Sequence, residues 1–410
     1  MNDHNPETLV IAFNFPPFND GSAVTIAKRI VNAGKPVDVI AADLSSVRNR
    51  DDSLFGLIAP LVNRVEYVHI PITFASEVGV RNFVEAGLST ISRFRRKQPY
   101  ASIFSRSMWA HSHFLAAELR ARGVSKHWTA EFSDPLLWQA DASARPSGAI
   151  TEPSFMAYAL RAMGAREQAL LQEENSVLYW AQMVPYILAD ELLFTNEQQL
   201  DLMLQDAPQF LRERVVAKAV VSPHPTPQPA LYTSGANGAV TREPPFGPQS
   251  QAASREPGTF RIGYFGTFYP NRGGGEFLEA LSLLPPVERH RIRLDVYSSG
   301  ADHLIRAARH LGLRKNVRVL APLPYREFLS KTQEYDALLV NDIATTPFRM
   351  PSPFLPSKYS DYAGSKTPTI AITIPGSPLD QLPTRWKSHV GMIDSLAETL
   401  RTLLYSVDAG

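Results

Sequence analysis

Two series of alternating apolar runs and helical patterns constrain the fold of this chain more than any other feature of its sequence. The first series opens with an apolar run at residues 9–13 and a helical pattern at 23–33. The second series opens at residue 260. Strands that alternate with helices favour a parallel sheet whose two faces are both covered by helices. The sequence therefore predicts an α/β protein with two doubly wound domains in tandem.

The two series give a definite set of expected elements. In the first series we expect strands at residues 9–13, 37–41, 65–70, 101–104, 127–131 and 192–195, and helices at 23–33, 77–97, 111–122, 165–188 (broken near Pro185) and 197–204. In the second we expect strands at 261–265, 292–297, 317–320, 336–340 and 369–373, and helices at 275–284, 302–311, 325–332, 357–363 and 393–405. Ligands of such sheets bind outside the carboxyl ends of the strands, so the loops that follow strands are the places to search for a site.

A stretch of different composition separates the two series. Residues 222–258 are rich in Pro, Gly, Ser, Thr and Ala and hold few large apolar side chains. Such a stretch cannot bury a core, so we expect a linker or a long loop. The predicted organisation is an N-terminal domain at 1–221, the linker at 222–258 and a C-terminal domain at 259–410, in keeping with a chain too long for one ordinary core.

Composition excludes several classes of function. The chain has 41 Lys and Arg against 40 Asp and Glu, without the basic excess of a nucleic-acid-binding protein. It has no cysteine, which excludes disulfides, thiolate zinc sites and a cysteine nucleophile. A secretory signal has a basic start and an apolar run, whereas residues 1–8 are polar. The longest apolar window, 177–189, is too short to cross a bilayer. We therefore expect a cytoplasmic protein.

The proline-rich loop at residues 347–363 is the first candidate for a site. It lies between two expected strands and delivers Lys358 and Asp361, three residues apart, onto one face of a short helix. A cation and a carboxylate at a strand-to-helix switch suit a ligand with phosphate at one end and hydroxyl groups at the other. The alternative is a surface ion pair, which contributes little to stability.

A glycine-rich loop follows the first strand of the second series. Arg272 and the three glycines after it stand at the start of an expected helix. A guanidinium fork, bare backbone N–H groups and the helix dipole together suit a diphosphate. No Gly-Lys-Ser/Thr follows, so the loop is not a Walker motif. The alternative is an ordinary flexible loop.

Two loops of the first series are also candidates for a ligand-binding site. In residues 14–22, Gly21 permits close approach of the backbone, and the helix N-terminus that follows offers N–H groups to an anion. The alternative there is a helix cap by Asp20 or Ser22. Asp134 follows another strand at its carboxyl end, where the alternative is a routine Asp-Pro turn.

Three further groups have weaker interpretations. Residues 105–107 (Ser-Arg-Ser) end a strand that faces the expected cleft, where they could contact a hydroxyl or a phosphate. His111 and His113 diverge on a helix and belong to no His-Glu-x-x-His motif, so we expect no metal site. The basic residues within 93–97 read as a solvated helix end, or alternatively as a patch that touches anionic lipid.

Four segments resemble, in order and spacing, motifs of the family 4 glycosyltransferases of the GT-B fold. Residues 263–269 with Arg272 resemble the opening of the donor domain, and 356–362 resemble the Pro-Ser-Lys-x-x-Glu-Tyr segment of many bacterial members. Residues 13–22 and 132–135 resemble two loops of the acceptor-side domain. The resemblance implies two Rossmann-like domains facing across a cleft, the C-terminal one binding a nucleotide sugar and the N-terminal one binding the acceptor.

The resemblance also implies a role for each candidate residue. Arg272 and Lys358 would neutralise the diphosphate leaving group, and Asp134 would join them as a catalytic residue. Asp361 would accept hydrogen bonds from ribose hydroxyls. The remaining donor-binding positions are Gly21, Ser22, Gly266, Thr267 and Ser357. Family members usually retain the anomeric configuration without a metal, so neither a metal nor another cofactor is expected.

The implied function is a retaining glycosyltransferase of bacterial surface polysaccharide or glycoconjugate assembly. Its partners would be a nucleotide-diphosphate sugar and a glycan or lipid-linked acceptor, with peripheral contact with the cytoplasmic face of the inner membrane and no nucleic acid. Four positions depart from the family pattern: Pro353 and Asp361 stand in place of two glutamates, Thr267 in place of an arginine and Arg272 in place of a lysine. These departures leave two alternatives, a non-catalytic GT-B protein that binds a partner glycosyltransferase and a sugar-nucleotide epimerase.

Overall fold

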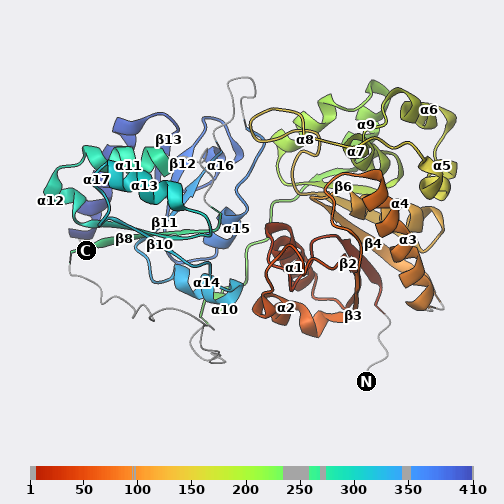
Figure 1. Cartoon of the computed structure of the whole chain (residues 1–410), viewed down its shortest axis with the longest axis horizontal. Coiled ribbons are helices and arrows are strands. Elements are labelled where there is room, and N and C mark those ends of the chain that lie inside the picture. Colours follow the sequence, from red (N-terminus) through yellow and green to blue (C-terminus); the bar gives the residue numbers. More distant parts are fainter. Residues whose placement is uncertain are drawn as a thin grey trace. The chain divides into compact units, whose positions relative to one another are not determined.

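The computed structural model describes residues 6–94, 96, 98–233, 258–267, 274–343 and 352–408. The chain divides into two compact units, Met1–Pro225 (unit 1) and Thr226–Gly410 (unit 2). Each unit has its own parallel sheet with helices packed against it (Figure 1). The predicted α/β class with two doubly wound halves is therefore confirmed.

The sheet of unit 1 has seven described strands in the order β3-β2-β1-β4-β5-β6-β7, and every adjacent pair is parallel. The strands are β1 (Thr8–Ala12), β2 (Val37–Ala42), β3 (Val62–Val68), β4 (Tyr100–Ser107), β5 (Ser125–Phe132), β6 (Glu191–Phe194) and β7 (Ala219–Val221). The order runs outward from β1 in both directions, so the loops after β1 and β4 lie at the switch point of the sheet.

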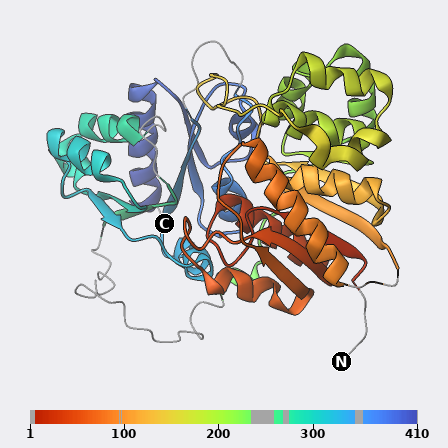
Figure 2. The same ribbon diagram turned by 45° about the vertical axis from the view of Figure 1, so that its right-hand side comes forward.

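Helices cover both faces of this sheet. They are α1 (Gly21–Ala33), α2 (Asp52–Ile58), α3 (Glu77–Phe94), α4 (His111–Ala121), α5 (Ala157–Ala162), α6 (Ala165–Glu173), α7 (Val177–Leu188), α8 (Glu197–Gln205) and α9 (Gln209–Lys218), with short 3₁₀ turns at Ala59–Leu61 and Pro153–Met156. Figure 2 shows α3 and α4, in orange, side by side over one face. Successive strand residues point to opposite faces, so Ser105 bonds to α4 through His113, whereas Arg106 bonds to α1 on the other face.

Unit 2 repeats the plan with six described strands in the order β10-β9-β8-β11-β12-β13, again parallel throughout. The strands are β8 (Phe260–Phe265), β9 (Ile292–Tyr297), β10 (Val317–Leu320), β11 (Ala337–Asn341), β12 (Thr369–Thr373) and β13 (Trp386–His389). The helices are α10 (Ala230–Thr233), α11 (Gly274–Leu283), α12 (Pro286–Arg289), α13 (Asp302–His310), α14 (Tyr325–Thr332), α15 (Lys358–Tyr362), α16 (Pro378–Gln381) and α17 (Ile393–Asp408).

The sheet of unit 2 separates two apolar clusters. Ala337 and Leu339 of β11 belong to the larger cluster, which includes buried side chains of α11, α13 and α17. Leu338 and Val340, which alternate with them, belong to a smaller and more aromatic cluster with Phe265 at the end of β8. The continuous apolar strands of the sequence are thus explained by burial on both faces.

The expected strands are all present, but the helix expected at 165–188 breaks in a different place. It is two helices, α6 and α7, that are separated at residues 174–176, and Pro185 lies inside α7. Ser176 caps α7 by accepting a hydrogen bond from the backbone N–H of Tyr179 at 3.3 Å. Pro185 stands near the carboxyl end of the helix, where its missing N–H removes only one late hydrogen bond.

The proline-rich stretch between the series is only partly described. Ser222 and His224 are held within unit 1, and α10 belongs to unit 2 and packs on α14. Residues 234–257 lie outside the described residues. Of the helices in the described ranges, none has both the length and the apolar character that a membrane span requires.

Candidate functional site

The candidate site of unit 2 begins where β8 ends. Gly266 follows β8 with a positive φ of 106°, which favours glycine, and its N–H donates to the carbonyl of Tyr297 at 3.0 Å. Phe265 stacks on Tyr297 with ring centroids 4.7 Å apart, and its N–H donates to the hydroxyl of Tyr362 at 3.0 Å. This hydroxyl joins the end of β8 to α15, so the loop after β8 and the loop before α15 are held together.

Lys358 lies at this junction. Its ammonium group is 3.5 Å from the centre of the Tyr264 ring, within the range of a cation–π contact. A Cβ atom built on Gly266 would lie 3.7 Å from the Lys358 Nζ, so the cation stands directly beside the backbone of that glycine. Lys358 and Gly266, which the resemblance assigns to one donor-binding site, therefore lie side by side.

The neighbouring candidate positions have more varied surroundings. Ser357 and Thr267 are exposed beside Lys358 and Gly266 in sequence, and the Thr267 carbonyl accepts a hydrogen bond from the Tyr264 hydroxyl at 3.1 Å. Arg272 lies outside the described residues. Of the two cations predicted for this site, Lys358 is therefore the one that the structure describes.

The Asp361 side chain of α15 is buried against the neighbouring helix α14 rather than exposed to solvent. It is 6% exposed, and its Oδ1 accepts a hydrogen bond of 2.7 Å from the hydroxyl of Tyr325 on α14. Its backbone carbonyl accepts a 2.5 Å bond from Tyr232 on α10. Burial and the nearby carboxylate together hold the pKa of Tyr325 well above its ordinary value, so the phenol remains a donor. Asp361 thus joins α15 to α10 and α14, and the predicted contact with ribose remains a prediction.

We expect Tyr325→Phe to destabilise unit 2 by about 1–2 kcal/mol, because it removes a buried hydrogen bond to a carboxylate. Thermal unfolding followed by circular dichroism measures the loss. Tyr405→Phe is the matched control, since Tyr405 is 59% exposed. An equal effect of the two changes would contradict the buried contact.

In unit 1, Gly21 and Ser22 belong to the first turn of α1, which begins two residues before the expected start at 23. The Ser22 backbone N–H, however, donates to the carboxylate of Asp20 at 2.8 Å, so the capping alternative describes this group. The Ser22 hydroxyl accepts a 3.1 Å bond from Arg106 Nε. Ser22 therefore makes these contacts within unit 1, and the role of Gly21 and Ser22 beside a phosphate remains a prediction.

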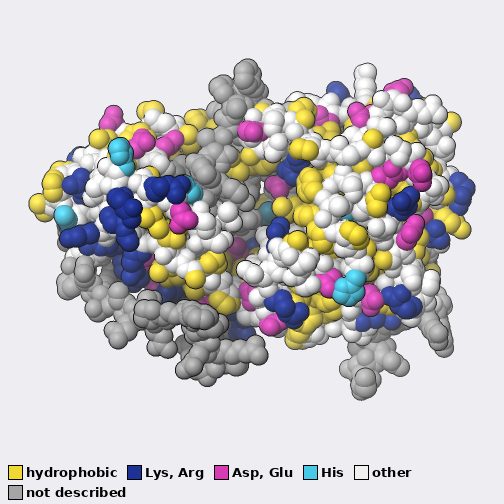
Figure 3. Space-filling view, viewed as in Figure 1, with side chains coloured by type: hydrophobic (Ala, Val, Ile, Leu, Met, Phe, Trp, Pro, Cys, Tyr) yellow, Lys and Arg dark blue, Asp and Glu magenta, His cyan; other side chains and the backbone are white. Residues whose placement is uncertain are grey.

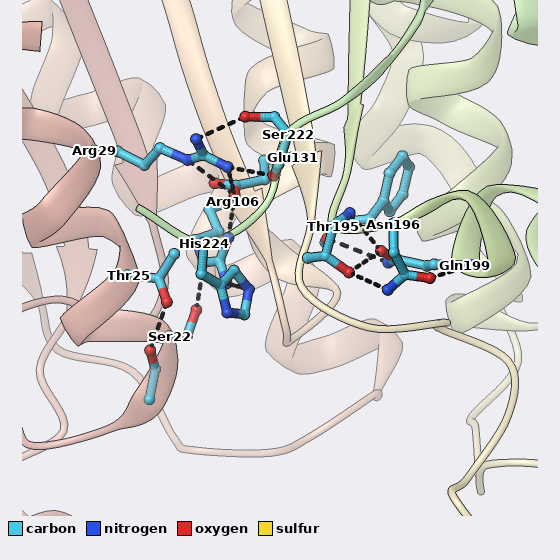
Figure 4. Close-up of polar contacts among 12 residues, drawn as sticks. Ser22, Thr25, Arg29, Arg106, Glu131, Thr195, Asn196, Gln199, Ser222 and His224 are labelled. Atoms are coloured by element: carbon cyan, nitrogen blue, oxygen red, sulfur yellow. Dashed lines mark hydrogen bonds and ion pairs between the residues drawn. The ribbon is translucent and has the colours of Figure 1, made fainter. Parts of the chain in front are cut away.

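A buried charge cluster lies next to Ser22 and was not predicted as a unit. Glu131 of β5 forms an ion pair with Arg106 of β4, with an N–O distance of 2.5 Å, and accepts a hydrogen bond from Arg29 of α1 at 3.0 Å (Figure 4). Burial would raise the pKa of Glu131, but the two guanidinium groups outweigh it and hold that pKa below its ordinary value. Arg106, one of the three residues that could have contacted a ligand, is 2% exposed and paired with Glu131.

The same cluster holds the segment with which the chain leaves unit 1. Arg29 donates to the hydroxyl of Ser222 at 2.7 Å and to its carbonyl at 2.8 Å. Arg106 NH2 lies 3.4 Å from Nε2 of His224. Burial, and then the surrounding cations, hold the pKa of His224 well below its ordinary value, so this imidazole is neutral and accepts from Arg106. The strand register places Arg106 opposite Glu131, and no local sequence pattern indicates this pairing.

Two polar side chains at the carboxyl edge of this sheet have no hydrogen-bond partner among the described residues. Asn14, after β1, is 3% exposed, and neither atom of its amide is bonded. Ser133, after β5, is 6% exposed with an unbonded hydroxyl. Asp134 follows it and is half-buried. Buried polar groups are normally satisfied, so this edge is suited to a polar ligand.

The two histidines of α4 are core residues. Both are fully buried, and His111 stacks on Phe13 with ring centroids 4.1 Å apart. Burial lowers the pKa of each to about 3, so both are neutral in the folded protein. Within the described ranges, no group of three or more His, Cys, Asp or Glu side chains could hold a metal ion.

These histidines predict a loss of stability in acid. The unfolded chain binds a proton at each near pH 6.5, while the folded chain binds it only near pH 3, so stability falls as pH drops through this interval. We expect His111→Phe to reduce the slope of the free energy of unfolding against pH by about 1.4 kcal/mol per pH unit. Urea unfolding at about pH 6 and pH 5, followed by tryptophan fluorescence, measures it. An unchanged slope in the variant would show that His111 takes up its proton without unfolding.

Comparison with solved structures identifies the fold as GT-B. The chain is similar to the Anabaena protein HepE, solved in complex with UDP-glucose, with a TM-score of 0.58 and 13% identity over 98% of this chain and 90% of that one. It is similar to sucrose-phosphate synthase from Thermosynechococcus elongatus, with a TM-score of 0.57 and 14% identity over 97% and 90% of the two chains.

A third similar structure is an α,α-trehalose-phosphate synthase (UDP-forming) from Burkholderia xenovorans, in complex with glucose-6-phosphate. Its TM-score is 0.56, with 12% identity over 97% of this chain and 92% of that one. The sequence matches no protein-family model and no curated protein. At these identities the likeness is one of fold, and the predicted GT-B architecture is confirmed.

Proposed function

We propose that this protein is a glycosyltransferase that moves a sugar from a nucleotide-diphosphate donor to a glycan or lipid-linked acceptor. The observation that carries the proposal is the position of Lys358, held over the Tyr264 ring and beside the Gly266 backbone at the carboxyl end of β8. A cation there can meet the diphosphate as the glycosidic C–O bond breaks and negative charge grows on the leaving group. The fold supports it, because the similar HepE structure holds UDP-glucose.

The remaining assignments follow from the same proposal. The donor lies against unit 2, where Thr267 and Ser357 offer exposed hydroxyl groups, Gly266 lets the donor come close to the backbone because it has no side chain, and Arg272 supplies a second cation. The acceptor lies against unit 1, where the half-buried Asp134 and the unbonded amide of Asn14 are suited to its hydroxyl groups. The reaction retains the anomeric configuration without a metal.

The proposed setting is the assembly of bacterial surface polysaccharide or glycoconjugates. The enzyme works in the cytoplasm, where it meets the nucleotide sugar, and peripherally at the inner membrane. Nucleic acid is not a partner in this proposal.

Thermal-shift measurements against a panel of UDP-, GDP- and dTDP-sugars test the proposal. We expect one base to stabilise the protein at concentrations above its dissociation constant, because a ligand that binds only the folded state raises the midpoint of unfolding. Hydrolysis or transfer of the same sugar would follow in a product assay. A protein that neither binds nor turns over any of these sugars would not be a glycosyltransferase.

One specific feature favours a second candidate, a non-catalytic GT-B protein that binds a partner glycosyltransferase. Pro353 stands where related enzymes carry a glutamate, and it is buried. This candidate predicts nucleotide binding without turnover, together with a partner that co-purifies. Product analysis without an acceptor separates both candidates from an epimerase, which converts the donor alone.

A further inference from the structure

Basic residues are concentrated at one end of unit 2. Residues 286–293 and 306–315 together contain seven Lys or Arg and one acidic residue, Glu288, whereas the whole chain has 41 basic and 40 acidic residues. Figure 3 shows Lys and Arg side chains gathered over the part of unit 2 that holds α12 and α13. The rest of the chain is therefore acidic on balance, and the positive charge is local.

The two segments are neighbours in the fold. Both precede strands, 286–293 leading into β9 and 306–315 leading into β10, so they lie at the amino ends of the sheet. The side-chain amide of Asn316 donates to the carbonyls of Arg289 at 2.7 Å and Ile292 at 2.9 Å, which fixes the two loops side by side. This end of unit 2 is opposite the carboxyl ends that carry Lys358.

The charges at this end are exposed and not neutralised by carboxylates. Arg306, Arg309, Arg314 and Lys315 are all exposed, and no described acidic side chain lies within ion-pair distance of them. Glu288 is paired with Arg401 of α17 at 3.1 Å. The four cations therefore present their charge to solvent.

Exposed apolar side chains lie on α11 and α12, the helices next to the segments that carry these cations. Val287 of α12 is 79% exposed, and Leu283 at the end of α11 is 54% exposed. Tyr405 of α17 is 59% exposed. It lies one helical turn from Arg401, and Arg401 forms an ion pair with Glu288 of α12. Apolar and aromatic side chains among cations are the composition of a surface that sits at a lipid headgroup layer.

We propose that this surface, the basic-apolar patch of Leu283, Val287, Arg306, Arg309, Arg314 and Lys315, binds an anionic lipid bilayer. The cations attract acidic headgroups, and Val287 and Leu283 enter the boundary between headgroups and acyl chains. A nucleic acid would gain nothing from the aliphatic side chains, which offer no stacking surface for bases. The proposal does not depend on the reaction that the protein catalyses.

The patch replaces the surface that the sequence suggested for membrane contact. In residues 93–97, Arg93 is paired with Glu66 at 2.6 Å and Arg96 with the buried Asp38 at 3.7 Å. Arg96 also stacks over the Tyr100 ring at 3.9 Å. These two cations are therefore engaged within unit 1, and Arg95 and Lys97 lie outside the described residues.

Co-sedimentation of the full chain with vesicles tests the proposal. We expect binding to phosphatidylglycerol–phosphatidylcholine vesicles at low salt and none to phosphatidylcholine alone. The triple change Arg309→Gln, Arg314→Gln and Lys315→Gln should weaken the partition about a hundredfold, since each cation near the surface contributes about fivefold. Val287→Ser should weaken it several-fold, and this loss should persist when salt screens the charges.

The matched control removes three exposed cations elsewhere, through Lys35→Gln, Lys126→Gln and Lys366→Gln. It has the same net charge as the patch variant, and we expect it to bind like the unaltered protein. Equal binding by the two triple variants would overturn the proposal, as would absence of binding to anionic vesicles. Patch-dependent binding to a single-stranded RNA, undiminished by Val287→Ser, would overturn it in favour of a nucleic-acid surface.

Discussion

Lys358→Ala is expected to weaken the binding of nucleoside diphosphates by about ten- to a hundredfold, while leaving the fold intact. The ammonium group lies beside the backbone of Gly266 at the end of β8, where a diphosphate can meet the cation without a side chain of residue 266 in its way. A charge-assisted hydrogen bond to phosphate contributes about 1.5–3 kcal/mol, which corresponds to the expected range. Isothermal titration with UDP, GDP and dTDP measures the affinities of the unaltered protein and the variant.

Two further variants serve as controls for this prediction. Lys366→Ala removes an exposed lysine from the same unit and should leave the affinity unchanged. Lys358→Arg keeps the charge, but the larger guanidinium cannot take the same place over the Tyr264 ring, so we expect partial recovery only. If Lys358→Ala binds nucleotides as tightly as the unaltered protein, the diphosphate does not lie at this lysine.

Glu131→Gln is expected to lower the free energy of unfolding of unit 1 by about 3 kcal/mol. The change keeps the shape of the side chain but leaves Arg106, which is 2% exposed, and Arg29 without their shared counter-charge. Removing one partner of a buried ion pair costs far more than the pair contributes, because the remaining charge stays buried. Urea unfolding followed by tryptophan fluorescence measures it, since four of the five tryptophans lie in unit 1.

Glu66→Gln is the control for this prediction. Glu66 and Arg93 form a pair of similar length, 2.6 Å, but both are largely exposed, and we expect a loss below about 1 kcal/mol.

Acid gives a second check on the Glu131→Gln prediction, because the folded-state pKa of Glu131 lies below its ordinary value of 4.5. The stability that the carboxylate contributes is present above this value and is lost as pH falls through the lowered pKa, so the gap between the unaltered protein and Glu131→Gln should narrow in acid. A gap that is independent of pH would contradict the charge pairing.

The strands were predictable because parallel strands buried on both faces give continuous apolar runs. Residues 292–297, 317–320 and 369–373 coincide with β9, β10 and β12. The edge strands β7 and β13 escaped prediction, since each is short and partly exposed and β13 carries Lys and His side chains. Their place in the sheet is set by neighbours, which a local pattern does not contain.

The candidate site was predictable at its backbone positions but less so at its charges. Gly266 and Lys358 could be placed together because both follow strands of one parallel sheet. Arg106 could not be assigned, because its partner Glu131 is 25 residues away and only strand register puts the two side by side. Asp361 was predicted to face a ligand, but the direction of a side chain on so short a helix depends on its contacts with α10 and α14.

Position 266 has a consequence for the divergence of related chains. The φ of 106° disfavours every residue with a side chain, and the first carbon of any side chain would occupy space 3.7 Å from the Lys358 ammonium. Mutation at 266 would therefore strain the backbone, whereas the distance to the cation is that of an ordinary van der Waals contact. We expect homologues to keep glycine at position 266 whether or not they keep the lysine.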